Sequence, residues 1–214
     1  MAQPAAYDTL REGVRVTFEL EDRRSRFVAT LARAGSERAA RELVEEVRAA
    51  NRDARHNVFA YSLADGRERA TDDGEPHGTA GMPVLEELRA AGLADACCVV
   101  TRYFGGVLLG TGGLQRAYSG AAKGACALAR ERGDVCRMTL VRRVAVQLPY
   151  ALYDRVRRMC EDAGGRVADS LFQEDVQLTC VFAAGEEERF VAAVTELAAG
   201  EQLCSVGEPV FAEL

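Results

Sequence analysis

A strand with no polar face, followed by a glycine-rich turn and a long helix, constrains the fold of this chain most strongly. The run Ala96–Val100 is apolar at every position, which predicts a central strand covered on both faces of its sheet. Five glycines lie in the nine residues from Gly105 to Gly113. The helix expected after this turn has an apolar stripe formed by Leu114, Ala117, Tyr118, Ala121, Ala125 and Leu128. We therefore expect a domain in which helices and a sheet share one core.

The rest of the first 140 residues alternates strand and helix patterns. Apolar residues recur at every second position from Val14 to Leu20, as in a half-buried strand. In chain order we then expect a strand at about Ser25–Arg33, a helix from the N-cap Ser36 to about Asn51, a strand at Val58–Leu63 and a helix capped by Thr79.

Two glycines, Gly120 and Gly124, lie one turn apart inside the long helix. Each costs about 1 kcal/mol relative to alanine in a helix. We therefore expect a neighbouring element to approach the helix closely at these positions, because such an approach would compensate for that cost.

Residues 141–214 form a separate pattern. A strand at Val144–Leu148 is followed by a helix ending at Gly164–Gly165, strands at about Arg166–Phe172 and Val176–Phe182, a helix opened by Glu186, Glu187 and Glu188, and a last strand between Gln202 and Phe211. The order βαββαβ is that of the split ferredoxin-like arrangement. We therefore predict an α+β protein with two domains, residues 1–140 and 141–214.

The charge of the chain divides at the same boundary. The net charge is −6, from 27 Lys and Arg against 33 Asp and Glu, which excludes a uniformly basic coat for nucleic acid. Residues 1–140 hold 20 basic and 20 acidic residues, whereas residues 141–214 hold 7 and 13. A polyanionic partner is therefore expected to contact a local patch of the first domain, and the acidic second domain is a candidate to bind protein.

The cysteines and the N-terminus predict a reducing compartment. The 7 cysteines include no Cys-x-x-Cys pair, and most lie in apolar runs, where free cysteine behaves as a small buried hydrophobe. The first residues lack the basic and apolar regions of a signal peptide. No apolar run approaches the ~20 residues that span a bilayer, so we expect no membrane contact and a cytoplasmic location.

The glycine-rich turn is the strongest candidate for a binding site. Glycines let a backbone approach a ligand without obstruction by Cβ, and free amides at a helix N-terminus favour a phosphate or carboxylate. Guanidinium groups before and after the turn could add charged hydrogen bonds. The alternative is a tight connection whose glycines serve only its geometry. The residues predicted to bind an anion or nucleic acid are Arg102, Tyr103, Gly105, Gly106, Gly110, Thr111, Gly112, Gly113 and Arg116.

An acidic loop is the second candidate. It brings together Asp72, Asp73, Glu75, His77 and Thr79. The carboxylates could hold Mg²⁺ beside a phosphate, and the histidine could act as a base near neutral pH. The alternative is that the carboxylates cap the following helix and a nearby turn while Pro76 stiffens the loop. No spacing matches a metal fingerprint, so we predict no resident cofactor and keep Mg²⁺ as the open possibility.

Other reactive residues are weaker candidates. His56 could face a site or pack internally, and the aromatic pair Tyr103–Phe104 could stack a base or belong to the core. Ser119 lacks the context of a nucleophile elbow, and Cys97–Cys98 has no adjacent base, so we do not expect a covalent hydrolase.

Two long motifs resemble those of the YigZ/IMPACT family, and most closely those of its bacterial branch. They are TDDGEPHGTAGMPVLEEL at Thr71–Leu88 and VVTRYFGGVLLGTGGLQRAYSGA at Val99–Ala121. The elements Ser25-Arg26-Phe27 and Arg55-His56-Asn57 lie where that family has similar ones. His77 departs from the small residue usual at its position, which widens the possible chemistry of the acidic loop.

The resemblance implies a first domain of the ribosomal protein S-five domain-two-like type and a ferredoxin-like second domain similar to modules of elongation factor G. Both architectures occur in translation proteins that face RNA, which is an analogy of fold. The family's eukaryotic members regulate a translation-factor kinase pathway through an additional N-terminal RWD domain, which we do not expect here.

Two hypotheses of function follow. The first is a non-catalytic cytoplasmic protein that binds RNA, the ribosome or another phosphate-rich partner through Arg102, the glycine turn and Arg116, with a role in translation regulation. The second is a small phosphate-handling enzyme, in which the acidic loop holds metal and His77 or Asp73 transfers protons. The oligomeric state is left open by the sequence.

Overall fold

The computed structural model describes residues 6–213 and divides into two compact units. Unit 1 ends at Arg137 and unit 2 begins at Met138, three residues before the boundary expected from the sequence. Both units contain helices and sheets, and each has its own hydrophobic core. The α+β class expected from the sequence is therefore confirmed.

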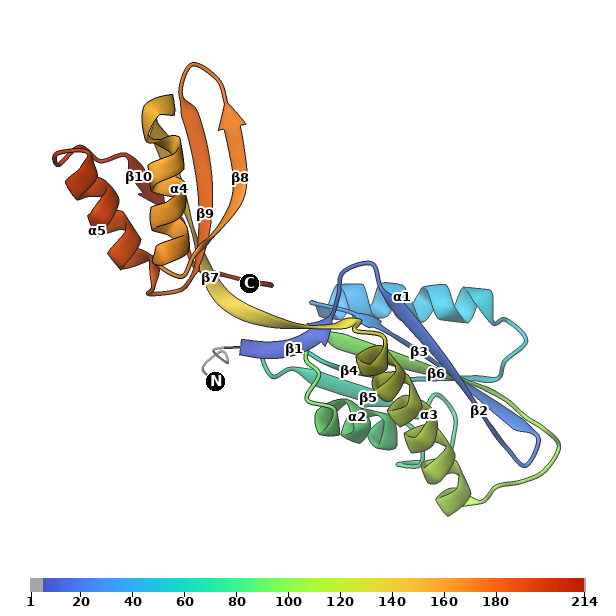
Figure 1. The fold of residues 1–214 in the computed structure, drawn as a ribbon. Helices are drawn as coiled ribbons and strands as arrows, with labels where there is room; N and C mark the ends of the chain where they lie inside the picture. The colour runs from blue at the N-terminus through green and yellow to red at the C-terminus, as the bar shows by residue number, and fades with distance from the viewer. Residues whose placement is uncertain (1–5, 214) are drawn as a thin grey trace. The chain divides into compact units, whose positions relative to one another are not determined.

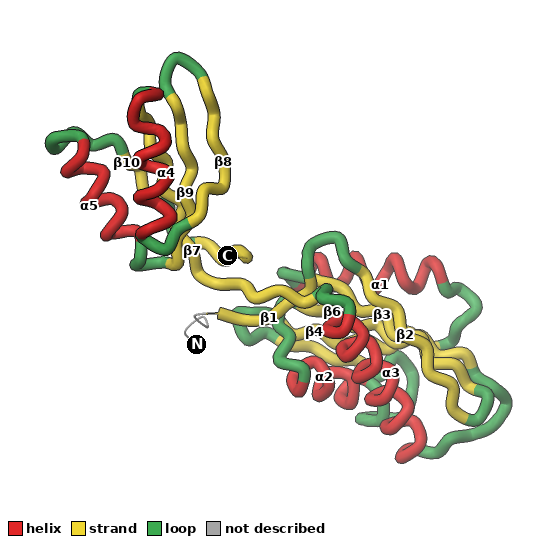
Figure 2. The backbone as a smooth tube through the Cα atoms, in the orientation of Figure 1, coloured by secondary structure: helices red, strands yellow, loops and turns green. Residues whose placement is uncertain are grey.

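Unit 1 is built on a five-stranded antiparallel sheet (Figures 1 and 2). Its strands in spatial order are β2 (Arg15–Asp22), β3 (Ser25–Arg33), β6 (Ala96–Tyr103), β4 (His56–Ser62) and β5 (Glu68–Thr71). The apolar strand β6 lies in the middle of the sheet, and its residues 96–102 are all buried. This is the position that its unbroken apolar run predicts.

Helices cover both faces of this sheet. Helix α1 (Glu37–Ala50) packs on one face through Leu43, Val44 and Val47. Helices α2 (Gly81–Ala90) and α3 (Thr111–Glu131) pack on the other face, where the larger core lies. Figure 1 shows the sheet between these two helical layers. Ser36 caps α1 as predicted, since its hydroxyl accepts a hydrogen bond from the amide of Ala39.

Helix α3 lies directly against strand β2, as its internal glycines predict. A Cβ at Gly124 would lie 2.2 Å from the ring of Phe18, and one at Gly120 would lie 3.1 Å from Leu20. The two glycines therefore permit the close approach of β2 to the helix.

Two short strands of unit 1 were not predicted. Strand β1 (Ala6–Leu10) and strand β5 contain 5 and 4 residues. Neither AYDTL nor ERAT alternates strictly between apolar and polar residues, which is the pattern that predicts a half-buried strand. Strand β1 is stabilised by segments distant in the sequence, as in the bond from the Ala94 amide to the Asp8 carbonyl, whereas β5 forms a hairpin with the preceding strand β4.

Unit 2 follows a βαββαβ order with one extra terminal strand. Its elements are β7 (Val135–Leu148), the short 3₁₀ helix η1 (Tyr150–Leu152), α4 (Tyr153–Asp162), β8 (Arg166–Phe172), β9 (Val176–Ala183), α5 (Glu187–Leu197), β10 (Cys204–Val206) and β11 (Val210–Glu213). Antiparallel pairing gives the order β10-β7-β9-β8, and β11 pairs with the first half of β7. The single last strand expected between Gln202 and Phe211 is thus two strands.

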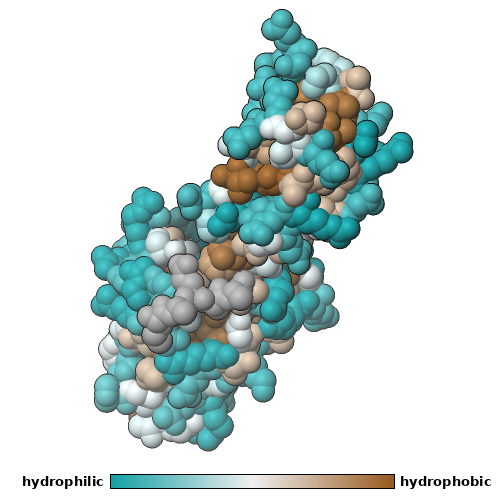
Figure 3. Space-filling model, turned by 90° about the vertical axis from the view of Figure 1, so that its left-hand side faces the viewer, coloured by the Kyte–Doolittle hydropathy of each residue, from teal (hydrophilic) through white to brown (hydrophobic). Residues whose placement is uncertain are grey.

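Helices α4 and α5 cover one face of the unit 2 sheet and bury residues such as Val144, Cys180 and Phe190. In Figure 3 the surface of unit 2 carries apolar patches among hydrophilic side chains. None of the helices in residues 6–213 combines the length and the apolar character that a membrane span requires.

Candidate functional site

The two sequence motifs meet in unit 1 around a buried group of three side chains. Arg102, at the end of β6, donates from Nη1 to Oε1 of Glu75 at 2.7 Å, and the hydroxyl of Tyr118 donates to the same oxygen at 2.8 Å. Glu75 comes from the acidic loop and Tyr118 from the second turn of α3. The glycine turn and the acidic loop are therefore joined through this carboxylate.

The position of Arg102 differs from the expectation that it faces a ligand. Its side chain is 8% exposed and that of Glu75 is 4% exposed. The rings of Phe27 and Phe104 lie 5.6 Å from its guanidinium carbon, one from the core and one from the loop above. The guanidinium of Arg102 therefore joins the acidic loop, through Glu75, to the glycine turn, through Phe104. Its charge and both of its faces already have partners within the protein.

The start of α3, unlike Arg102, is open to solvent. Gly110 precedes the helix with a φ of 73°, and the exposed residues Thr111 and Gly112 begin it. Their amides have no carbonyl within the helix to bind, as in any first turn. Arg116 is exposed, and its guanidinium nitrogen lies 3.6 Å from the Cβ position of Gly112. Open amides and one free guanidinium therefore share this surface.

The glycines of the turn also serve its geometry. Gly106 and Gly110 have φ values of 84° and 73°, in the left-handed region. A Cβ at Gly105 would lie 2.1 Å from the backbone of Arg24, and one at Gly113 would lie 2.9 Å from Leu109. Packing and turn shape thus account for four of the glycines, and Gly112 remains open to solvent.

Asp72 in the acidic loop caps helix α2. Its carboxylate accepts hydrogen bonds from the amides of Gly78, Ala80 and Gly81 at 2.8–3.1 Å. Burial opposes its ionisation, but these amides together lower the pKa of Asp72 below its usual value. The helix begins at Gly81 instead of after Thr79, whose hydroxyl donates to the carbonyl of Pro76. The cap predicted at Thr79 is therefore supplied by Asp72.

Asp73 ties the acidic loop to α1 and β4. Its carboxylate accepts from the guanidinium of Arg48 at 2.9 Å and from the amide of Asn57 at 2.7 Å. Its carbonyl lies 2.8 Å from Nδ1 of His56, which places that histidine in a structural contact. Asp72, Asp73 and Glu75 are thus each engaged, and the described residues contain no group of three side chains suited to hold a metal ion.

Of the five candidate residues in the acidic loop, His77 alone is exposed. Its side chain is fully accessible, and its Nδ1 lies 3.7 Å from Oδ2 of Asp72. The neighbouring carbonyl of Gly78 accepts a long hydrogen bond of 3.4 Å from Gln115 on α3. His77 and the open start of α3 therefore belong to one region of the surface.

The other reactive side chains are internal. Cys97 and Cys98 are buried, and burial raises the pKa of Cys97 to about 12. Ser119 donates to Glu87 at 2.5 Å. Tyr103 is half-buried, with its hydroxyl bonded to Asn51.

The sequence alone does not mark Arg24, Arg48 or Tyr118 as parts of this region. Tyr118 was assigned to the apolar stripe of its helix, and its hydroxyl reaches Glu75 from that buried face. Arg24 lies in a two-residue turn between two predicted strands, and only the contact with Gly105 shows its importance. The turn itself was visible in the sequence, whereas the contact was not.

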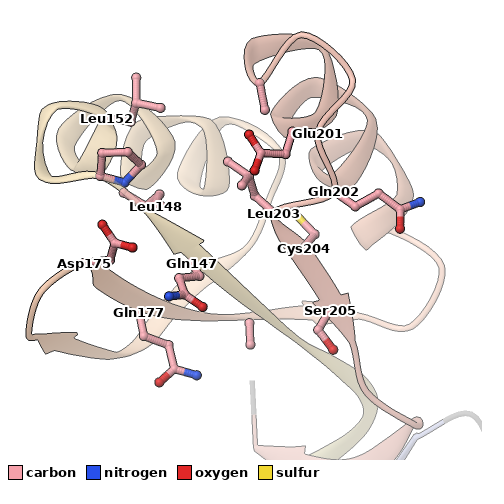
Figure 4. A pocket seen from close by; sticks show the side chains of 13 residues that line it. Gln147, Leu148, Leu152, Asp175, Gln177, Glu201, Gln202, Leu203, Cys204 and Ser205 are labelled. Atoms are coloured by element: carbon pink, nitrogen blue, oxygen red, sulfur yellow. The ribbon is translucent and has the colours of Figure 1, made fainter.

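A separate cavity of about 560 Å³ lies within unit 2 (Figure 4). Asp175, Glu201 and the amide side chains of Gln147 and Gln177 lie around it, and no basic side chain lines it. Its lining therefore combines negative charge with hydrogen-bonding amides.

Comparison with known proteins agrees with this two-part architecture. The model of the Impact N-terminal domain matches residues 23–126, and that of a domain of unknown function (DUF1949) matches residues 146–201. A crystal structure described as that of a hypothetical protein is similar over 95% of this chain and 97% of its own, with 31% identity and a TM-score of 0.63. These matches define a two-domain α+β protein with an Impact-type first domain.

Curated relatives identify the family. IMPACT family member YvyE of Bacillus subtilis is 32% identical over 210 residues, covering 97% of this chain and 94% of that protein. IMPACT family member YigZ of Escherichia coli is 34% identical over 198 residues, covering 90% and 95%. The chain belongs to the IMPACT family.

Proposed function

We propose that this chain is a non-catalytic cytoplasmic protein that binds nucleic acid or the ribosome through unit 1 and acts in translation regulation. The open first turn of α3 beside Arg116 carries the proposal. Amides at a helix start attract phosphate, and the adjacent guanidinium adds a second positive group. The carboxylates that a phosphate-transfer enzyme would need for metal are occupied by protein partners.

The domain folds support the same function by analogy. We assign unit 1 to the ribosomal protein S-five domain-two-like type. We assign unit 2 to the ferredoxin-like type, because its βαββαβ order and its sheet order β10-β7-β9-β8 match that arrangement. Similar modules occur in RNA-facing translation factors, and a fold shared with such proteins is support of a general kind.

One observation favours the enzyme as a second candidate. His77 is exposed and lies beside Asp72, close to the open amides of α3. A histidine in that position could transfer a proton to or from a phosphate-bearing ligand. An activity assay distinguishes the two candidate functions, because only the enzyme would turn over a nucleotide.

The test uses a carboxylate placed at the helix start. Thr111→Glu fills the anion position with negative charge, and an acidic residue in a first helical turn leaves the helix stable. We expect wild-type protein to co-sediment with ribosomes or with RNA at low salt. The Glu variant should bind at least tenfold more weakly, whereas the matched Thr111→Gln variant should bind like wild type.

The same preparations are assayed for ATP hydrolysis with Mg²⁺. Turnover by wild type that is lost in His77→Ala would overturn the binding proposal in favour of the enzyme. Equal binding by the Glu and Gln variants would show that the start of α3 is not the contact.

A further inference from the structure

Strand register brings three loops to one end of the unit 1 sheet, and two of them contain arginines. Asp22 pairs with Ser25, Arg26 with Tyr103, and His56 with Arg102. The β2–β3 turn, the loop 51–55 before β4 and the loop 104–110 after β6 therefore leave the sheet at the same end. The three loops lie together on the right of Figure 1. They are joined by contacts, since Gly105 packs on Arg24 and Tyr103 bonds to Asn51.

The arginines of these loops, together with Arg116 on α3, lack the internal partners that Arg102 has. Arg23, Arg24, Arg52, Arg55 and Arg116 are exposed, and within residues 6–213 no carboxylate lies within ion-pair distance of them. Gly124 and Gly120 lie on the face of α3 that packs against β2, and Arg116 lies one turn nearer the start of the helix on the same face. Arg116 is therefore on the side of α3 nearest the β2–β3 turn.

Acidic side chains at this end are fewer. Glu21, Asp22 and Asp53 also lie there without an ion pair in the described part of the chain, and Glu19 is already paired with Arg26. Five guanidinium groups without an ion pair therefore lie at this end with three carboxylates without one, and Asp72 beside the start of α3 is bonded to backbone amides. This is a local basic patch on a unit whose total charge is balanced.

The β2–β3 turn holds its two arginines in an unfavourable backbone conformation. Arg23 and Arg24 have φ values of 45° and 65°, and they form the two-residue connection between the paired residues Asp22 and Ser25. Such turns prefer Asn-Gly, because both central residues need a positive φ. The hydroxyl of Ser25 accepts from the amide of Gly105 at 3.1 Å, which fixes the turn on the glycine loop. Arginine is disfavoured at both positions of this turn, so the presence of two arginines there points to a function for their charge.

An exposed aromatic ring lies in the same surface. Phe104 is 53% exposed, next to Gly105 in the loop that holds the turn. Guanidinium groups beside an accessible aromatic ring are the combination with which proteins bind single-stranded nucleic acid, since bases stack on the ring and phosphates contact the charges.

We propose that this end of unit 1 binds a single-stranded polynucleotide, with phosphates on the β2–β3 turn and Arg116 and a base on Phe104. This proposal rests on the function proposed above and names the contact surface and the form of nucleic acid.

The experiment measures binding of full-length protein to labelled 20-nucleotide oligo-U, oligo-dT and a duplex of the same length, between 50 and 200 mM salt. The main variant is Arg23→Asn with Arg24→Gly, which supplies the residues the turn prefers and removes both charges. Its affinity for a single strand should fall at least tenfold. The slope of log K against log salt should become shallower by about 1.4, from two phosphates at about 0.7 each.

Two further variants complete the design. Arg38→Ala with Arg41→Ala removes the same charge from α1, on the other face of the sheet, and should bind like wild type. Phe104→Leu keeps an apolar cover over Arg102 and should weaken single-strand binding about fivefold or more without changing the salt slope.

The outcomes separate this proposal from the one it rests on. If wild type binds but the turn variant keeps its affinity and slope, the surface is elsewhere and the proposed function stands. If the duplex binds as tightly as the single strands and Phe104→Leu has no effect, the single-strand assignment is overturned. If wild type binds neither oligonucleotides nor ribosomes at 50 mM salt, the proposed function fails as well. Preference between oligo-U and oligo-dT identifies which single strand is bound, and either supports the proposal.

Discussion

At Arg102 the chain holds a guanidinium group that solvent barely reaches, between two aromatic rings and against the carboxylate of Glu75. Two charges removed from water are costly to bury, and their attraction compensates for this cost only while both are present. The hydroxyl of Tyr118 satisfies the same carboxylate oxygen. Removal of the carboxylate charge leaves a buried cation without compensation, whereas removal of the hydroxyl leaves the pair intact.

We therefore expect Glu75→Gln to lower the free energy of unfolding by about 3 kcal/mol. Tyr118→Phe should lower it by only about 1 kcal/mol, the net contribution of one hydrogen bond. Urea unfolding followed by circular dichroism measures both, with the exposed Glu12→Gln as a control that should stay near wild type. Equal stability of Glu75→Gln and the control would show that the pair is not needed.

The residue types of the candidate site could be predicted from the sequence, but their partners could not. Asp72, Gly112 and Arg116 were recognised because helix starts need caps and free amides attract anions. Arg102 is predicted to bind an anion because it lies just before the glycine turn, yet the structure buries it. Its partner Glu75 is 27 residues away in the chain, and only the packing of the acidic loop on α3 brings them together.

At the level of elements, the contact between α3 and β2 depends on the absence of side chains. Gly124→Ala improves the helix propensity of α3, yet its methyl group would lie 2.2 Å from the ring of Phe18. We expect a net loss of about 2 kcal/mol in the free energy of unfolding, because the close packing leaves no room for the extra carbon.

Gly120→Ala is the matched comparison, since its methyl group would meet only the flexible end of Leu20 at 3.1 Å. This variant should be near neutral in the same unfolding experiment. Combining Gly124→Ala with Phe18→Leu should recover part of the loss, and a double variant that merely adds the two single losses would argue against a direct contact.

The long elements were predicted well because their patterns repeat. Strand β3 has the predicted bounds, and α1 begins after the predicted cap. Strand β7 begins at Val135, earlier than the clear alternation from Val144. Its first half pairs with β11, a strand of 4 residues whose partner is about 70 residues away, so local sequence gives little indication of either.

At the scale of the whole molecule, each unit has its own hydrophobic core. We therefore expect a core substitution in one unit to leave the stability of the other unit unchanged. Phe190 is buried in the core of unit 2 and stacks on Phe182 with ring centres 5.0 Å apart. Phe190→Ala should destabilise unit 2 by about 3–5 kcal/mol. Hydrogen exchange should then accelerate for amides of β8, β9 and α5, while amides of β6 and α3 in unit 1 keep wild-type protection. Equal acceleration in both units would show that they unfold together.

The contact between Gly105 and the backbone of Arg24 leaves two loops unable to evolve independently. Any side chain at position 105 would require the β2–β3 turn to move or lengthen. Across descendants of this sequence, a larger residue at that position should therefore occur only together with an insertion or deletion in the hairpin. An alignment of such descendants would reveal this coupling as correlated change between two sites 81 positions apart.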